Sequence, residues 1–302
     1  MSSGKPKLGM TQLLRLAGIV LLIAAGLAGV PPMAPVLYAQ FTSGVNLVEV
    51  YATVTDRQGE PVTGLAATDF AVSEDGARQA ITAFAAGEFP LAVAIGLDRS
   101  FSMADKSNRL GVAKSAARTF VGSLRTSDQV MVIAIGGEIE VAAPLTADHG
   151  AALAAIDRLE AWGTTPLYDA ARAALDAIQS AGGRRALVLL SDGTDRYSDT
   201  AAAELVDRAR RRDVLIYPIA LGASRPPVFA ELAAATGGRS FHTREPGQLA
   251  KTMTAIAREL RFQYLLGYVP SRGTSEPGWH AIDVSVSRPD VRVRAREGYF
   301  SR

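Results

Sequence analysis

Long apolar runs and amphipathic stretches alternate along the middle of the chain, from about residue 90 to residue 263. The apolar runs, which predict strands, are 91–97, 129–136, 140–145, 185–192, 214–222 and the short 240–243. The amphipathic stretches, which predict helices, are 109–124, 149–162, 167–181, 201–212, 227–237 and 247–262. Near-continuous apolar strands are typical of a sheet covered on both faces. The alternation therefore predicts an α/β fold with a doubly wound, mostly parallel sheet and right-handed crossovers.

The stretches 44–88 and 264–302, on either side of this region, show a different pattern, in which apolar and polar residues alternate one by one. In residues 48–55 the side chains of Val48, Val50, Ala52 and Val54 would share one face, as expected of a half-covered strand. Further candidate strands lie at 69–76 and 79–87, and alternation returns in 279–289 and 290–300. Three strands are too few for a sandwich, so we expect the two ends to pack together as one small antiparallel β-sandwich.

The N-terminus has the layout of an export signal. Lys5, Lys7 and Arg15 precede an uncharged run from Leu16 to Val30, which is shorter than a typical spanning helix. We favour cleavage after Ala39. The alternative is an uncleaved N-terminal anchor, and this segment would then be the only part of the chain that contacts the membrane. The predicted organisation is a signal or anchor at 1–39, sandwich strands at 40–88, the α/β domain at 89–263 and sandwich strands at 264–302. The expected location is periplasmic, extracellular or tethered to the outer side of the inner membrane.

Composition narrows the classes of function. The 302 residues are 48% hydrophobic and carry a formal charge of +2 from 32 basic and 30 acidic side chains. Without a strong overall charge, nucleic acid is not an expected partner. The chain has no cysteine, which excludes disulfides and thiol nucleophiles.

Small oxygen-bearing side chains follow the predicted strands of the α/β domain. Asp98, Ser100 and Ser102 come at the end of the first strand, and Asp192 ends the fourth. A third loop, 162–169, is rich in small polar residues. Ligands of doubly wound sheets bind at the carboxyl ends of the strands. Carboxylates and hydroxyls without clustered imidazole predict a site for a hard cation, Mg²⁺ first and Mn²⁺ second.

Residues 90–263 resemble the von Willebrand factor type A domain, whose metal-ion-dependent adhesion site is written D-x-S-x-S, then a Thr, then an Asp on separate loops. The matching positions are Asp98, Ser100, Ser102, Thr165 and Asp192, with Thr164 as the alternative to Thr165. The family usually has two glycines before its Thr, and here only Gly163 is present. With its strand-rich ends, the chain looks like the related domain of exported bacterial proteins.

The resemblance implies a protein-binding module rather than an enzyme. A partner's Glu or Asp carboxylate would complete the shell of the cation. Arg99 and Phe101 occupy the variable positions of the metal loop and are candidates to face such a ligand, with inward packing of one of them as the alternative. The alternative is a structural or scaffolding protein in which the metal only stabilises loops. A metal-dependent hydrolase is less favoured: an aspartyl-phosphate enzyme generally has an Asp where Ser100 stands, and no G-x-S-x-G elbow is present. The three histidines, His149, His242 and His280, are scattered and are expected to be surface or packing residues.

Overall fold

The computed structural model describes residues 47–87, 89–104, 108–193, 195–271 and 277–301. The predicted signal or anchor at 1–39 lies outside these residues. Among the helices that the structure describes, none has the length and apolar character needed to span a bilayer.

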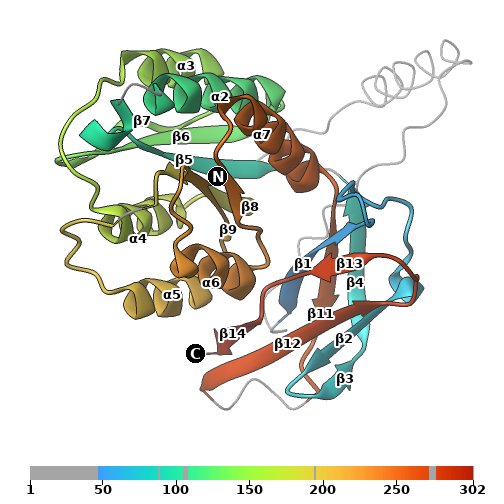
Figure 1. The fold of residues 1–302 in the computed structure, drawn as a ribbon. Helices are drawn as coiled ribbons and strands as arrows, with labels where there is room; N and C mark the ends of the chain where they lie inside the picture. Colours follow the sequence, from blue (N-terminus) through green and yellow to red (C-terminus); the bar gives the residue numbers. More distant parts are fainter. Residues whose placement is uncertain (1–46, 88, 105–107, 194, 272–276, 302) are drawn as a thin grey trace, which may run out of the picture. The chain divides into compact units, whose positions relative to one another are not determined.

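A six-stranded sheet forms the centre of the α/β part (Figure 1). Its order is β10 (Phe241–Thr243), β9 (Leu215–Leu221), β8 (Arg184–Ser191), β5 (Leu91–Asp98), β6 (Gln129–Ile135) and β7 (Ile139–Thr146). All pairs are parallel except β6 with β7. The prediction of a doubly wound, mostly parallel sheet is confirmed.

Helices cover both faces of this sheet, which explains the apolar runs of its strands. One core contains residues of α2 (Arg109–Ser123), α3 (His149–Arg158) and α7 (Pro246–Arg261). The opposite core contains residues of α4 (Leu167–Ile178), α5 (Ala202–Arg210) and α6 (Pro227–Thr236). Neighbouring residues of β5 alternate between the two: Val93 and Ile95 belong to the first core, and Ala92 and Ala94 to the second. The predicted helix 149–162 was too long, because the chain leaves the helix at Leu159, whose backbone is extended.

The remaining strands form two antiparallel sheets. One has the order β13 (Arg292–Arg294), β1 (Val48–Thr55), β11 (Gln263–Tyr268) and β4 (Ile81–Gly87). The other has the order β14 (Gly298–Ser301), β12 (Gly278–Val286), β2 (Phe70–Glu74) and β3 (Ala77–Gln79), and a single-turn 3-10 helix, η1 (Ala67–Asp69), precedes β2. Both sheets contribute to one hydrophobic core, to which Val50, Leu266, Val72 and Ile282 belong. The expectation that antiparallel strands from both ends of the chain pack together is confirmed.

Two details of these sheets differ from the expectation. The stretch 290–300 is not one strand: β13 pairs with β1, and β14 pairs with β12 in the other sheet. Residues 295–297, which include Arg296, lie between them and lack strand structure. Thr53 and Thr55 are also buried, although alternation places them on the exposed face. Gln263 explains the first case, because its side-chain amide donates a hydrogen bond to the Thr53 hydroxyl at 2.8 Å.

Candidate functional site

The carboxylate of Asp98 lies at the carboxyl end of the central strand β5 and is completely buried. Its Oδ1 accepts a hydrogen bond from the Ser100 backbone N–H at 2.9 Å, and its Oδ2 accepts one from the Ser191 hydroxyl at 2.6 Å. Burial raises the pKa of Asp98, although these hydrogen bonds act in the opposite direction. Among the described residues, no basic side chain forms an ion pair with it. A buried carboxylate in such surroundings is a suitable ligand for a cation.

The two serines that follow bring their hydroxyl groups together. Ser100 Oγ and Ser102 Oγ are 3.0 Å apart, in and just before the short 3-10 helix η2 (Phe101–Ala104). Ser100 is 2% exposed, whereas Ser102 lies at the surface. The N-cap of helix α2 is Asn108, whose side chain accepts a hydrogen bond from the Gly111 N–H. The serine hydroxyls are therefore not needed as the N-cap of that helix.

The loop that carries Thr165 is attached to the Asp98 loop by two backbone hydrogen bonds. Phe101 N–H donates to the Gly163 carbonyl at 3.1 Å, and Trp162 N–H donates to the Arg99 carbonyl at 2.7 Å. Gly163 has a φ of +75°, and a Cβ there would lie 2.0 Å from the backbone nitrogen of Gly137. Thr165 is 2% exposed, while Thr164 is exposed. Of the two threonines, Thr165 is therefore the one that is buried, as Asp98 and Ser100 are.

Asp192 follows β8, next to Ser191, and is half-buried. Its negative charge is a minor cause of the raised pKa of Asp98, after burial. Arg109, the first residue of α2, places Nη1 3.7 Å from Asp192 Oδ2. The third loop is also joined to the second, because Arg196 N–H donates a hydrogen bond of 2.8 Å to the Thr165 carbonyl. The three predicted loops therefore meet at one edge of the sheet.

Arg99 and Phe101, the predicted ligand-facing residues, lie in contrasting environments. Arg99 donates a hydrogen bond of 2.9 Å to Glu140, and its guanidinium lies 5.3 Å from the centre of the Trp162 ring. Only 14% of its side chain is exposed. Phe101 is 65% exposed. Of the two, Phe101 is therefore directly available to a partner.

Two carboxylates outside the proposed ligand set support the site. Asp195 Oδ1 accepts hydrogen bonds from the Tyr168 N–H at 3.1 Å and the Ser198 hydroxyl at 2.6 Å. Asp169 accepts hydrogen bonds from the backbone N–H groups of Asp199 and Thr200. These contacts hold the start of α4, just after Thr165, against the loop that follows Asp192. Of the two, Asp195 was missed by the sequence analysis, because Asp–Ser pairs are too common in loops to mark it.

The donor set fits a hard divalent cation. Asp98 and Asp192 supply carboxylates, and Ser100, Ser102 and Thr165 supply hydroxyls, without sulfur or imidazole at these positions. Oxygen ligands of this kind suit Mg²⁺ or Mn²⁺. That these five residues are the individual ligands of such a cation stays a prediction from the sequence motif.

Comparison with known proteins agrees with this description. Residues 93–194 match the von Willebrand factor type A domain family. No curated protein matches the sequence. Among solved structures, a von Willebrand factor type A protein from Catenulispora acidiphila has a TM-score of 0.52 and 17% identity, covering 84% of this chain and 73% of that one.

Proximal thread matrix protein 1 from the mussel byssus is also similar. Its TM-score is 0.53 at 17% identity, and the match covers 62% of this chain but only 49% of that one, so about half of the byssus protein has no counterpart here. A second structure of the byssus protein, with TM-score 0.51 at 18% identity over 60% of this chain and 48% of that one, has a MIDAS motif occupied by zinc. At these identities the likeness concerns the fold. Together with the family match, it shows that this chain contains a von Willebrand factor type A domain.

Proposed function

We propose that this protein is an exported, divalent-metal-dependent protein-binding module. The observation that carries the proposal is the fully buried Asp98 carboxylate, which lies beside the paired hydroxyls of Ser100 and Ser102 at the edge where three loops meet. Hydroxyl and carboxylate oxygens gathered at one edge of a sheet favour the binding of a cation. Thr165 and Asp192 would complete the ligand set from the other two loops.

The proposed cation is Mg²⁺, or Mn²⁺, and the proposed ligand is a Glu or Asp carboxylate of a partner protein. Asp98 and Asp192 only balance the double charge of the ion, so an incompletely filled shell attracts a further carboxylate. Arg109, 3.7 Å from Asp192, offers a second positive group near the same place.

Exposed aromatic side chains lie on the loops of the proposed ion site and favour a protein as its ligand. In the described part of the chain, five large hydrophobic side chains are exposed, and three of them lie on the three loops: Phe101, Trp162 and Tyr197, with exposures of 65%, 42% and 80%. Aromatic residues are enriched in protein interfaces, where they supply much of the binding energy. A small free carboxylic acid would leave these side chains unused.

The organisation of the chain is part of the same proposal. Residues 1–39 would direct export or anchor the protein, 40–88 and 264–302 would form the sandwich, and 89–263 would form the binding domain. The location would be periplasmic, extracellular or on the outer side of the inner membrane. We assign no catalytic role, because the Ser191 hydroxyl, which donates to Asp98, is completely buried and is not accessible to a substrate.

The proposal is tested with Mn²⁺ as a probe of the open coordination position. Mn²⁺ bound to the metal-stripped full chain should enhance the relaxation of water protons, because exchangeable water fills the open position. Glutarate, a dicarboxylate, should then displace that water and lower the enhancement. The Asp98→Ala chain should show neither effect. Bound Mn²⁺ whose water does not respond to glutarate, together with a raised thermal midpoint, would instead support a structural or scaffolding protein whose metal only stabilises the loops.

A further inference from the structure

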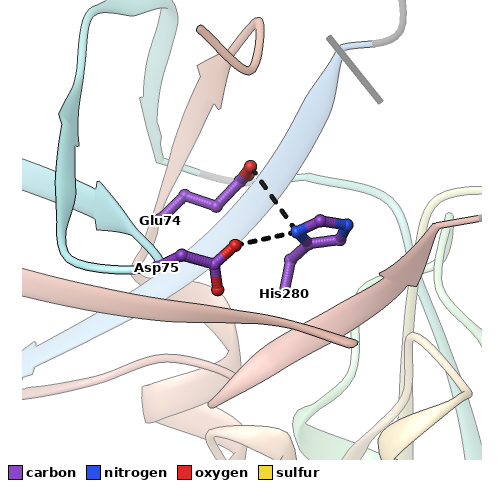
Figure 2. A group of neighbouring side chains, drawn as sticks. All are labelled: Glu74, Asp75 and His280. Carbon is purple, nitrogen blue, oxygen red and sulfur yellow. Dashed lines mark hydrogen bonds and ion pairs between the residues drawn. The ribbon is translucent and has the colours of Figure 1, made fainter. Parts of the chain in front are cut away.

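A second group of ligating side chains lies in the antiparallel sheets, away from the proposed cation site. Glu74 ends strand β2, Asp75 lies in the turn to β3, and His280 belongs to β12 (Figure 2). Strands β2 and β12 pair antiparallel, with Glu74 opposite Ile282. Asp75 has a φ of 50°, in the left-handed region, and Gly76 follows with a φ of 79°. This tight turn places the two neighbouring carboxylates beside the imidazole.

The imidazole nitrogen Nδ1 faces both carboxylates, as Figure 2 shows. It lies 2.9 Å from Asp75 Oδ2 and 4.0 Å from Glu74 Oε1. One ligand atom from each of the three residues lies within 4.8 Å of the others. Zinc contacts its oxygen and nitrogen ligands at about 2.0 to 2.2 Å, so one ion can reach three atoms at this spacing.

Each of the three side chains is oriented by a hydrogen bond through its other polar atom. Glu74 Oε2 accepts from the Tyr268 hydroxyl at 2.6 Å and from the Tyr299 hydroxyl at 3.2 Å. Asp75 Oδ1 accepts from the Ala281 N–H at 2.9 Å. Nε2 of His280 lies 3.1 Å from the hydroxyl of Ser301. Metal-binding histidines and carboxylates are typically held in this way by a second layer of hydrogen bonds.

Glu74 supplies an independent reason to expect a cation. The residue is only 6% exposed, and both tyrosine hydroxyls bond to its Oε2. Its other carboxylate oxygen, Oε1, lies 4.0 Å from His280 Nδ1, which is within ion-pair distance but too far for a hydrogen bond. A buried carboxylate is costly unless its charge is paired, and the two tyrosine hydroxyls are neutral. The Oε1 atom faces His280 Nδ1, as Figure 2 shows.

We propose that Glu74, Asp75 and His280 form a second metal site, which binds a divalent transition-metal ion with zinc as the best match. Two carboxylates neutralise the ion, and the imidazole favours zinc over Mg²⁺. Water would fill the remaining position, because 48% of the Asp75 side chain is exposed and leaves a path for entry. The proposal is independent of the function proposed for the Asp98 site.

Binding requires only small adjustments. Two ligands of a tetrahedral zinc ion lie about 3.3 Å apart, so the 2.9 Å contact between His280 Nδ1 and Asp75 Oδ2 would open by a few tenths of an ångström. Nδ1 would release the proton with which it now faces the carboxylates, while Nε2–H would donate to Ser301. The His280 ring also packs against Tyr299, with centroids 5.3 Å apart, which limits its rotation.

The bound ion would tie together strands that are distant in sequence. Glu74 precedes His280 by about two hundred residues, and Tyr268 reaches Glu74 from β11 of the other antiparallel sheet. A ligand that binds only the folded state raises its stability by mass action. Zinc should therefore raise the midpoint temperature at which the sandwich strands unfold.

The test uses zinc and the full chain, without a polyhistidine tag, in the Asp98→Ala background. That background removes the first site, which is necessary because the MIDAS motif of the similar byssus protein holds zinc. Calorimetric titration of Zn²⁺ should show one saturable equivalent, and adding His280→Gln or Glu74→Gln should weaken it at least ten-fold. The matched controls are Asp283→Asn, an exposed carboxylate on the same strand, and His149→Gln, whose ring bonds to the Asp128 carbonyl.

Co²⁺ provides a second readout that does not depend on stability. Its visible absorption in the Asp98→Ala chain should gain intensity on binding, as expected of a low-coordinate site with a nitrogen ligand, and His280→Gln should abolish the gain. The proposal is overturned if Zn²⁺ shows no saturable binding to the folded chain, or if His280→Gln and the His149→Gln control bind it equally. Either outcome would identify His280 as the partner of an ion pair only.

Discussion

The Ser191 hydroxyl donates a hydrogen bond of 2.6 Å to Oδ2 of Asp98, joining the ends of the adjacent strands β8 and β5. Both residues are completely buried. The same hydroxyl oxygen accepts a hydrogen bond from the Gly193 N–H at 3.0 Å, so Ser191 also shapes the turn after Asp192. One serine thus orients a carboxylate on one loop and the backbone of another.

Ser191→Ala should therefore affect both stability and metal binding. Hydrogen bonds to charged groups contribute about 1.5 to 3 kcal/mol, so the free energy of unfolding should fall by about 2 kcal/mol in urea denaturation. Mg²⁺ affinity should fall roughly ten-fold, because a ligand loses its orienting partner. Ser115→Ala, an exposed serine of α2, is the control and should change neither quantity. Unchanged Mg²⁺ affinity in Ser191→Ala would argue against Asp98 as a ligand.

Gly163 is the position where the loop of Thr165 is most sensitive to substitution. Its φ of +75° disfavours other residues, and a Cβ would lie 2.0 Å from the Gly137 nitrogen and 2.3 Å from its Cα. Gly163→Ala should displace this loop from the Asp98 loop, lowering the thermal midpoint and weakening Mg²⁺ binding.

The control for this substitution is Gly122→Ala. Gly122 lies in helix α2, and the space that a Cβ would occupy there is open, so alanine should leave stability equal or raise it by up to about 1 kcal/mol. Mg²⁺ affinity should stay at the wild-type value. Gly163→Ala with a wild-type midpoint and affinity would show that the loop contact does not maintain the site.

Asp176 predicts a pH dependence of stability. Burial by itself would raise the pKa of Asp176, but its hydrogen bonds and charge interactions with Arg208 and Arg212 outweigh this effect and lower it. A carboxyl whose folded pKa is depressed contributes stability above its unfolded pKa of about 3.9, and loses it as the pH falls through the folded value.

Asp176→Asn should accordingly be less stable than the wild type at pH 7 in urea unfolding. The difference should shrink as the pH falls below about 4, because the wild-type carboxyl then becomes neutral as well. Asp207→Asn removes the more exposed pair with Arg211 and should have a smaller effect at pH 7. A difference between Asp176→Asn and wild type that is constant from pH 7 to pH 3 would contradict the assigned role.

The central sheet could be predicted because its strands are almost entirely apolar. Such sequences indicate strands that are buried on both faces. The run from Leu91 to Leu97 has no polar residue, so the position of Asp98 at its end was evident from the sequence. The end of α3 at Arg158 was not evident, because Leu159, Ala161 and Trp162 continue an apolar pattern after the helix has ended. Hydrophobicity alone does not mark that change of backbone conformation.

The contacts that complete each site depend on residues that are distant in sequence. Ser191 reaches Asp98 only because β8 and β5 are neighbours in the sheet, and the sequence does not state that order. The same limit applies to His280, which was expected to be a surface or packing residue. Its approach to Glu74 follows from the pairing of β12 with β2, and alternation along a strand indicates a face but not a partner strand.

The central claim is that Asp98 is a ligand of a divalent cation, and calorimetric titration of Mg²⁺ into the metal-stripped full chain tests it most directly. We predict saturable one-to-one binding that is lost in Asp98→Ala and in the isosteric Asp98→Asn, while circular dichroism shows that both variants remain folded. Mn²⁺ should behave in the same way. Failure of the folded wild type to bind either ion, alone and with glutarate present, or equal binding by wild type and both variants, would contradict the claim.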